Sequence, residues 1–141
     1  MRRTQTKIYF DGGCRPNPGT METGVVARGE FHHRADAGRG SSERAEWLAL
    51  LDALDVARHL GIRDLLLVGD AAGVINQAMN GARCRTPALG ACRDRFQEEV
   101  QAFDRVRIRR VKRHQNLAGI ALGQVRQRRR MGEPPPKEPM A

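Results

Sequence analysis

Apolar and polar positions along the N-terminal third of the chain favour short β-strands. Residues 4–10 end on the apolar β-formers Ile8, Tyr9 and Phe10, and residues 24–28 and 30–34 are two more short segments with the character of strands, separated by Gly29. A loop rich in glycine and proline, residues 11–20, separates the first run from the second. This spacing predicts an antiparallel meander over residues 4–36.

The pattern becomes helical from Glu43 to about Leu60. Apolar residues recur there at three- and four-residue spacing and form one stripe: Trp47, Leu50, Leu51, Leu54 and Ala57. Such a stripe is typical of a helix that packs one face against a core. We expect Ser42 to cap its start and Gly61 to end it. Trp47 lies on the stripe, so we expect a core residue rather than a platform on which bases stack.

The remaining pattern predicts a strand, two helices, a strand and a last helix. The ranges are 64–69 for a buried strand, 71–79 and 87–103 for helices, and 106–111 for a strand, with Asn116 as the cap of the final helix. The order β-β-β-α-β-α-α-β-α predicts an α/β fold, in which a five-stranded mixed sheet with its first three strands antiparallel is flanked by helices. We expect one domain over 1–126 and a disordered, basic and proline-rich tail over 127–141.

Charge adds an expectation about partners. The chain has 25 basic and 16 acidic residues among 141 and a net charge of +9, which favours a polyanionic partner, nucleic acid first. No apolar run approaches about 20 residues, so we expect no membrane span. An apolar signal segment is absent from the N-terminus, and the three cysteines lack metal-type spacing, so we expect a cytoplasmic protein with reduced thiols. We also expect a monomer.

Three acids have positions that suggest a common site. Asp11 follows the first strand, Glu46 lies about one turn into the first helix, and Asp70 follows the apolar strand 65–68. If these carboxylates converge, their mutual repulsion calls for cations, and Mg²⁺ is the natural counter-charge for oxygen ligands. Each acid also fits a structural role by itself, as an Asx turn, a solvated helix position or a helix cap. Spacing alone does not decide between these interpretations.

The segments around the three acids decide it. They are Tyr9–Gly13 with Pro16–Gly19 and Gly24–Val26, Ser41–Leu50, Val68–Gln77, and Val111–Arg113 with Asn116–Ala118. In order and spacing these segments resemble ribonuclease H of type 1 over roughly residues 4–125. The short passage from Gly81 to Thr86 leaves no room for the basic helical protrusion of some members, so the chain resembles the compact branch that lacks it.

The resemblance implies a metal-dependent endonuclease that cuts the RNA strand of an RNA–DNA hybrid with two divalent ions, Mg²⁺ or Mn²⁺. It makes Asp11, Glu46 and Asp70 the catalytic metal ligands. The residues that it places against the nucleic acid are Gly12, Gly13, Asn17, Ser42 and Arg113. The resemblance places His114 near the position where many members have a mobile histidine that helps the product leave, although an exposed histidine in a basic loop is the simpler interpretation.

One position departs from the family pattern. Ile120 stands where the fourth active-site carboxylate belongs, and the chain has no acid between Asp104 and Glu133. We therefore expect weak binding of the second metal and weakened cleavage. Two alternatives stay open: a catalytically inactive ribonuclease H-like module that binds RNA–DNA hybrid or RNA, and a domain of the reverse-transcriptase-associated type in a mobile element.

Overall fold

A computed structural model describes residues 5–132 of the chain. The strands are β1 (Thr6–Cys14), β2 (Gly19–Ala27), β3 (Glu30–Arg34), β4 (Arg39–Gly40), β5 (Asp64–Gly69) and β6 (Arg105–Arg110). The helices are α1 (Ser42–His59), α2 (Ala72–Met79), α3 (Pro87–Glu99) and α4 (Leu117–Arg130), with short 3₁₀ turns at Val100–Ala102 and Arg113–Gln115. None of the helices in this described part is long and apolar enough to cross a bilayer.

The strands form a mixed sheet in the order β3-β2-β1-β5-β6. The first three strands pair antiparallel, whereas β1 with β5 and β5 with β6 are parallel. This confirms the predicted five-stranded mixed sheet. The structure adds β4, a two-residue strand that pairs with β2 and is too short to produce a recognisable pattern.

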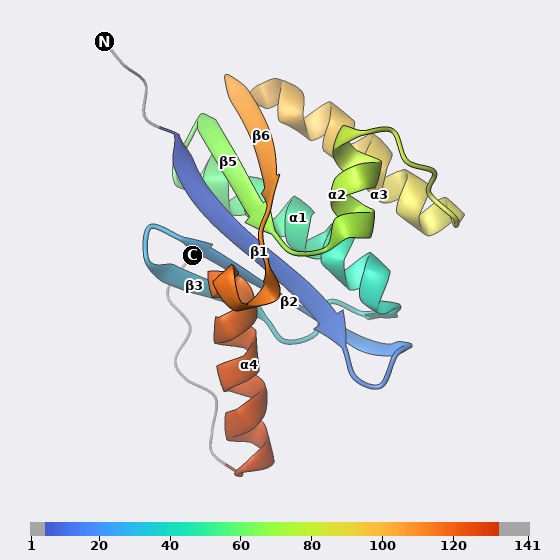
Figure 1. The fold of residues 1–141 in the computed structure, drawn as a ribbon, viewed down its shortest axis with the longest axis vertical. Coiled ribbons are helices and arrows are strands. Elements are labelled where there is room, and N and C mark those ends of the chain that lie inside the picture. The colour runs from blue at the N-terminus through green and yellow to red at the C-terminus, as the bar shows by residue number, and fades with distance from the viewer. Residues whose placement is uncertain (1–4, 133–141) are drawn as a thin grey trace.

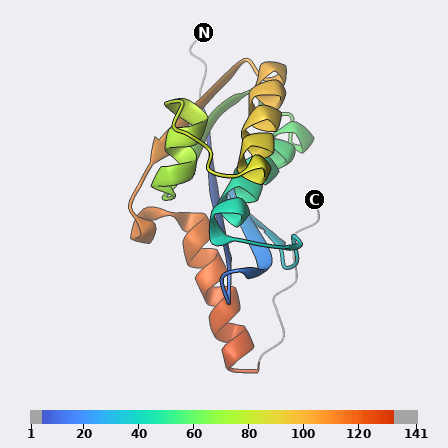
Figure 2. The same cartoon turned by 90° about the vertical axis from the view of Figure 1, so that its right-hand side faces the viewer.

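Helices cover both faces of the sheet. Figure 1 shows α1 crossing behind the strands and α4 lying in front of them. The main core lies between the sheet and α1, α2 and α3, with Trp47 fully buried there and edge-to-face with Phe96. On the other face, Leu122 of α4 packs closely over Gly24 of β2. Figure 2 shows α4 continuing past the rest of the fold toward the bottom of the view.

Strand β1 corrects the predicted loop over residues 11–20. It continues through Asp11 to Cys14, and residues 11–14 pair with residues 21–24 of β2. Asp11 therefore lies within the strand and not at its end. The glycines that suggested a loop are needed here for close packing, because a Cβ on Gly12 would lie 2.2 Å from the carbonyl oxygen of Ala45 in α1.

Helix boundaries differ from the prediction at three places. Ser41 and not Ser42 caps α1, since its hydroxyl accepts the backbone N–H of Arg44 at 3.1 Å. Helix α3 ends at Glu99, before the expected residue 103. Helix α4 continues through Arg130, beyond the expected domain boundary at 126, because Arg129 pairs with the buried Glu22 and neither glycine nor proline occurs between Arg126 and Gly132. Residues 133–141 of the predicted tail lie outside the described residues.

Candidate metal and nucleic-acid site

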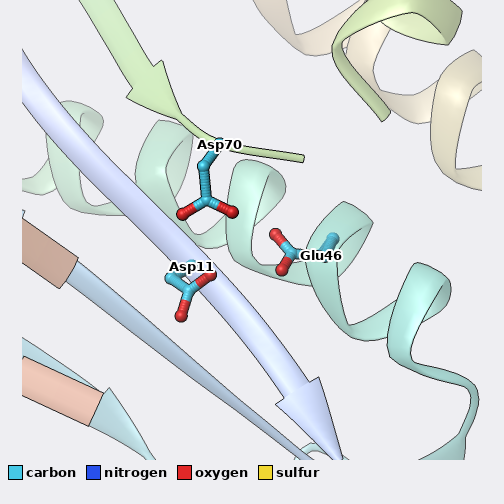
Figure 3. Close-up of side chains that lie close together, drawn as sticks. All are labelled: Asp11, Glu46 and Asp70. Carbon is cyan, nitrogen blue, oxygen red and sulfur yellow. The ribbon is translucent and has the colours of Figure 1, made fainter. Parts of the chain in front are cut away.

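Three elements bring the acidic side chains together. The parallel pairing of β1 with β5 ends at Tyr9 and Val68, and continuing its register places Asp11 opposite Asp70. Glu46 reaches the same place from α1, which packs tightly on β1 at Gly12. One carboxylate oxygen from each of Asp11, Glu46 and Asp70 lies within 4.8 Å of the others (Figure 3). The predicted convergence of the three acids is therefore present in the structure.

Asn116 connects this cluster to α4. Its side chain is fully buried, and its amide donates one hydrogen bond to Asp70 Oδ2 (2.9 Å) and another to the carbonyl oxygen of Phe10 (3.0 Å). Its carbonyl oxygen accepts the backbone N–H of Ala118 and so caps α4, as the sequence predicts (3.1 Å). One side chain thus connects Asp70, the Phe10 carbonyl group of β1 and the start of α4. Sequence reasoning found the cap but missed the contact with Asp70.

Burial and mutual repulsion dominate the electrostatics of the cluster. Burial, followed by the charge of Asp70, raises the pKa of Asp11 from 3.8 to about 6, although Glu46, Arg126 and Arg113 act in the opposite direction. Burial and the two neighbouring carboxylates raise the pKa of Glu46 well above its usual 4.5. The site therefore holds more negative charge than its own surroundings stabilise, and it favours either protons or bound cations.

A cavity of about 350 Å³ opens beside the cluster. Its lining comprises Asp11, Gly12, Gly13, Cys14, Arg15, Ser42, Glu46, Arg113, Gly119, Gly123 and Arg126. Two glycines of α4 leave the helix bare on this side, and Gly119 lies close enough to Asp11 that a Cβ there would be 3.4 Å from Oδ2. Acidic groups and guanidinium groups thus share one opening, which suits a phosphate held beside cations.

A second cavity, of about 330 Å³, lies on the other side of the N-terminus of α1. Among the residues that line it are Asn17, Ser41, Arg44, Arg85 and Thr86. The side-chain oxygen of Asn17 accepts the backbone N–H of Ser42 at 3.1 Å and so joins the two openings. Sequence reasoning missed Arg44 and Arg85, because nothing in their local pattern separates them from the many other arginines.

The residues predicted to contact nucleic acid differ in whether they line one of the two cavities. Gly12, Gly13, Ser42 and Arg113 line the cavity at the carboxylates, and Asn17 lines the neighbouring one. At Gly12, however, a Cβ would point toward α1, so close packing already explains why glycine occurs there. His114 is exposed in the turn Arg113–Gln115 and lines neither cavity. The roles of these residues in binding remain predictions.

Comparison with known proteins agrees with this geometry. The family model described as "reverse transcriptase-like" matches residues 9–124. The chain belongs to the reverse transcriptase-like family. Its predicted resemblance to ribonuclease H of type 1 is confirmed by a curated relative, Ribonuclease HI of Halobacterium salinarum, which is 34% identical over 126 residues. That match covers 86% of this chain but 63% of the relative, so the chain spans less than two thirds of the relative's length.

Solved ribonuclease H structures resemble this member of the family closely. RNase H1 from Halobacterium salinarum has a TM-score of 0.78 at 31% identity, with 84% of this chain and 94% of the other covered. An N-terminal RNase H domain from Mycobacterium tuberculosis has a TM-score of 0.75 at 26% identity, covering 89% and 98%. LC11-RNase H1, solved in complex with an RNA/DNA hybrid, has a TM-score of 0.71 at 23% identity, covering 80% and 89%, and shows the fold alone.

Two structural details agree with the departures that the sequence suggests, namely the absence of a protrusion and of a fourth carboxylate. Between α2 and α3, residues 80–86 contain no helix, in keeping with the compact branch that lacks a protrusion. Ile120 lies in the first turns of α4 with 43% of its surface exposed, where the fourth carboxylate was expected and is missing. Within residues 5–132, three carboxylates and not four form the cluster.

The donor set fits a divalent ion. All three groups offer carboxylate oxygens, the hard ligands that Mg²⁺ and Mn²⁺ accept. Glu46 Oε2 is buried and has no hydrogen-bond partner among the described residues, which is costly unless a proton or a cation satisfies it. A divalent cation therefore suits this site.

Proposed function

We propose that this protein is an endoribonuclease that uses Mg²⁺ or Mn²⁺ to cut the RNA strand of RNA–DNA hybrids. The observation that carries the proposal is the convergence of Asp11, Glu46 and Asp70, with a buried, unpartnered oxygen on Glu46. A fold-stabilising acid normally has a partner, whereas these acids are held together at a cost. The family of the chain supports the same activity.

The residues around the cluster suit a nucleic-acid substrate. Two cavities flank the N-terminus of α1, and arginines line part of each: Arg113 and Arg126 beside the carboxylates in one, Arg44 and Arg85 beside Glu43 in the other. A duplex has two phosphate backbones, so two neighbouring openings that each offer guanidinium groups suit a double-stranded polyanion. The LC11 relative was solved with an RNA/DNA hybrid, which favours the same substrate here.

In this proposal each residue of the cluster has a defined task. Asp11, Glu46 and Asp70 hold the divalent ions, and Asn116 fixes the orientation of Asp70 through its amide. When bound, the ions supply Lewis acidity at the phosphate and lower the pKa of a water. Since the fourth acid is absent, we infer that the second ion binds weakly and that cleavage is slower than in a four-carboxylate site.

Ile120 favours a second candidate function. A site that lacks one of its usual ligands fits a module that binds RNA–DNA hybrid or RNA without cutting it. A domain of the reverse-transcriptase-associated type within a mobile element is the third candidate. We favour the enzyme, because a protein that only binds nucleic acid has no use for three acids that repel each other and the phosphates.

The decisive experiment follows an end-labelled RNA–DNA hybrid in Mg²⁺ and, separately, in Mn²⁺. The parent is compared with Asp11→Asn, Asp70→Asn and Asp94→Asn, the last being a control acid on α3 whose side chain is 74% exposed. We expect cleavage by the parent and by Asp94→Asn, and at least a 100-fold loss in the other two, about 2.7 kcal/mol of barrier. If the parent retards the hybrid on a gel but cuts it in neither metal, the binding module is correct instead.

A further inference from the structure

Glu22 of β2 is a buried acid outside the carboxylate cluster. Its side chain is 8% exposed, and it accepts hydrogen bonds from Arg126 Nε (2.9 Å) and Arg129 Nη2 (3.0 Å), while His33 Nε2 lies 2.9 Å from Oε2. Burial alone would raise the pKa of Glu22, but these hydrogen bonds lower it to about 2. Glu22 is therefore ionised at neutral pH and holds two guanidinium groups of α4 on the sheet.

The two arginines held by Glu22 occupy different surroundings. Arg126 lines the cavity at the carboxylates and has 20% of its side chain exposed, whereas Arg129 does not line it and is 48% exposed. Arg126 uses Nε for Glu22, its hydrogen-bond partner in the described residues. A guanidinium carries five N–H donors, so the four on the two Nη atoms remain available to a ligand in the cavity.

Strand β1 sets the distance from Arg126 to the cluster. Asp11 and Gly13 point to the same face of the strand, because side chains alternate along it. Arg126 Nη2 lies above Gly13, 2.9 Å from where a Cβ would be, so Gly13 leaves room for the guanidinium. Two residues along a strand span roughly 7 Å, which is comparable to the spacing of successive phosphates on one nucleic-acid strand.

We propose that Arg126, positioned by Glu22, binds the phosphate next to the one that is cut, on the same RNA strand. This inference rests on the proposed function and names a subsite within it. The carboxylates receive the scissile phosphate together with the metal, and the guanidinium receives its neighbour through paired Nη donors. Because Glu22 holds Arg126 in place beforehand, little side-chain entropy is lost when the phosphate binds.

The test compares Arg126→Gln, Arg126→Lys and Arg129→Gln in single-turnover cleavage of a hybrid and in its binding. Arg126→Gln and Arg129→Gln each remove one ion pair to Glu22, so Arg129→Gln is the control for the loss of such a pair, and denaturant unfolding of both variants measures any difference in stability. We expect Arg126→Gln to lower the single-turnover rate constant at subsaturating enzyme by about 10- to 100-fold, Arg126→Lys to recover part of the loss, and Arg129→Gln to stay within about twofold. Equal losses in Arg126→Gln and Arg129→Gln would overturn the subsite.

A modified substrate identifies the phosphate itself. In each of a set of hybrids, one phosphate of the RNA strand beside the cleavage point is replaced by a neutral methylphosphonate. Cleavage of every hybrid is then measured with the parent and with Arg126→Gln. We expect one position to slow the parent strongly and to have no further effect on Arg126→Gln. Equal slowing of both proteins at every position refutes the subsite but not the nuclease. A parent that neither cuts nor binds the unmodified hybrid refutes the proposed function, and the subsite with it.

Discussion

The amide of Asn116 lies 2.9 Å from Asp70 Oδ2 and connects a helix cap directly to the carboxylate cluster. The two residues are separated by 46 positions in the chain, and no described side chain within α4 itself donates a hydrogen bond to the three acids. The start of α4 and the orientation of Asp70 are therefore set by the same group. A change at this position should affect stability and chemistry together.

Asn116→Asp separates these effects from a simple loss of volume. The new carboxylate keeps the cap but replaces the donor that faces Asp70 and the Phe10 carbonyl, so we expect a loss of roughly 3 kcal/mol in the free energy of unfolding. Cleavage should fall at least tenfold under conditions where the variant is folded. Chemical denaturation and a hybrid-cleavage assay measure the two effects. Asn80→Asp, at an exposed pair with Asn76, is the matched control and should change neither.

The raised pKa of Asp11 predicts how stability depends on pH without metal. An acid whose pKa is about 6 in the folded protein and 3.8 in the unfolded chain favours folding at low pH, and this advantage is lost as pH rises from 3.8 through 6. Asp11→Asn removes that penalty. We expect it to stabilise the metal-free protein at pH 7.5 by on the order of 1–2 kcal/mol after solvent screening, and to have little effect near pH 4.

A divalent metal should make the parent more stable than Asp11→Asn, which reverses the order expected without metal. Mg²⁺ or Mn²⁺ binds the folded parent and raises its Tm, whereas Asp11→Asn has lost a ligand and should respond weakly. Thermal unfolding with and without the ion, at pH 7.5, measures the difference. An equal rise in Tm for both proteins would show that the ion binds elsewhere.

Glu22 predicts the opposite dependence on pH. Its pKa is about 2 in the folded protein and 4.5 in the unfolded chain, so its contribution is fully present above 4.5 and disappears as pH falls through 2. Glu22→Gln should therefore lower the free energy of unfolding by roughly 2–3 kcal/mol at pH 7. The parent and the variant should converge near pH 2, and denaturant titrations at both pH values test this. A loss that persists at pH 2 would mean that packing and not charge explains the effect.

Ile120→Asp restores a carboxylate at the position where the family pattern expects one. Ile120 is 43% exposed, so the fold should tolerate the change. We expect faster cleavage and a lower metal concentration for half-maximal rate, because a fourth oxygen ligand strengthens the weak second site. Leu117→Asp is the control, since Leu117 lies on the same helix with 46% exposure, and it should leave the metal requirement unchanged. A metal titration of the cleavage rate decides between the two outcomes.

Local patterns in the sequence predict most of the helices and strands. The apolar stripe of α1 and the buried run of β5 depend on neighbouring residues alone, and both elements lie close to their predicted positions. The continuation of β1 was missed because Gly12 and Gly13 favour a loop locally. Pairing with β2 and the close approach of α1 override that preference.

The candidate site was predictable where it repeats family motifs and hidden where it depends on distant contacts. Asp11, Glu46 and Asp70 follow from motifs in a fixed order. Glu22 has no such signal, since its partners Arg126 and Arg129 lie 104 and 107 positions away. Ion pairs between such distant residues become visible only when α4 is placed on the sheet.

The arginines of β6 have a consequence for the behaviour of the protein at high concentration. β6 forms one edge of the sheet, where unpaired backbone groups can recruit a strand from another molecule. Its exposed residues include Arg105, Arg107 and Arg109, spaced along one side of the strand. Two such edges repel each other before their backbones can pair. The basic strand therefore protects the chain against edge-to-edge aggregation.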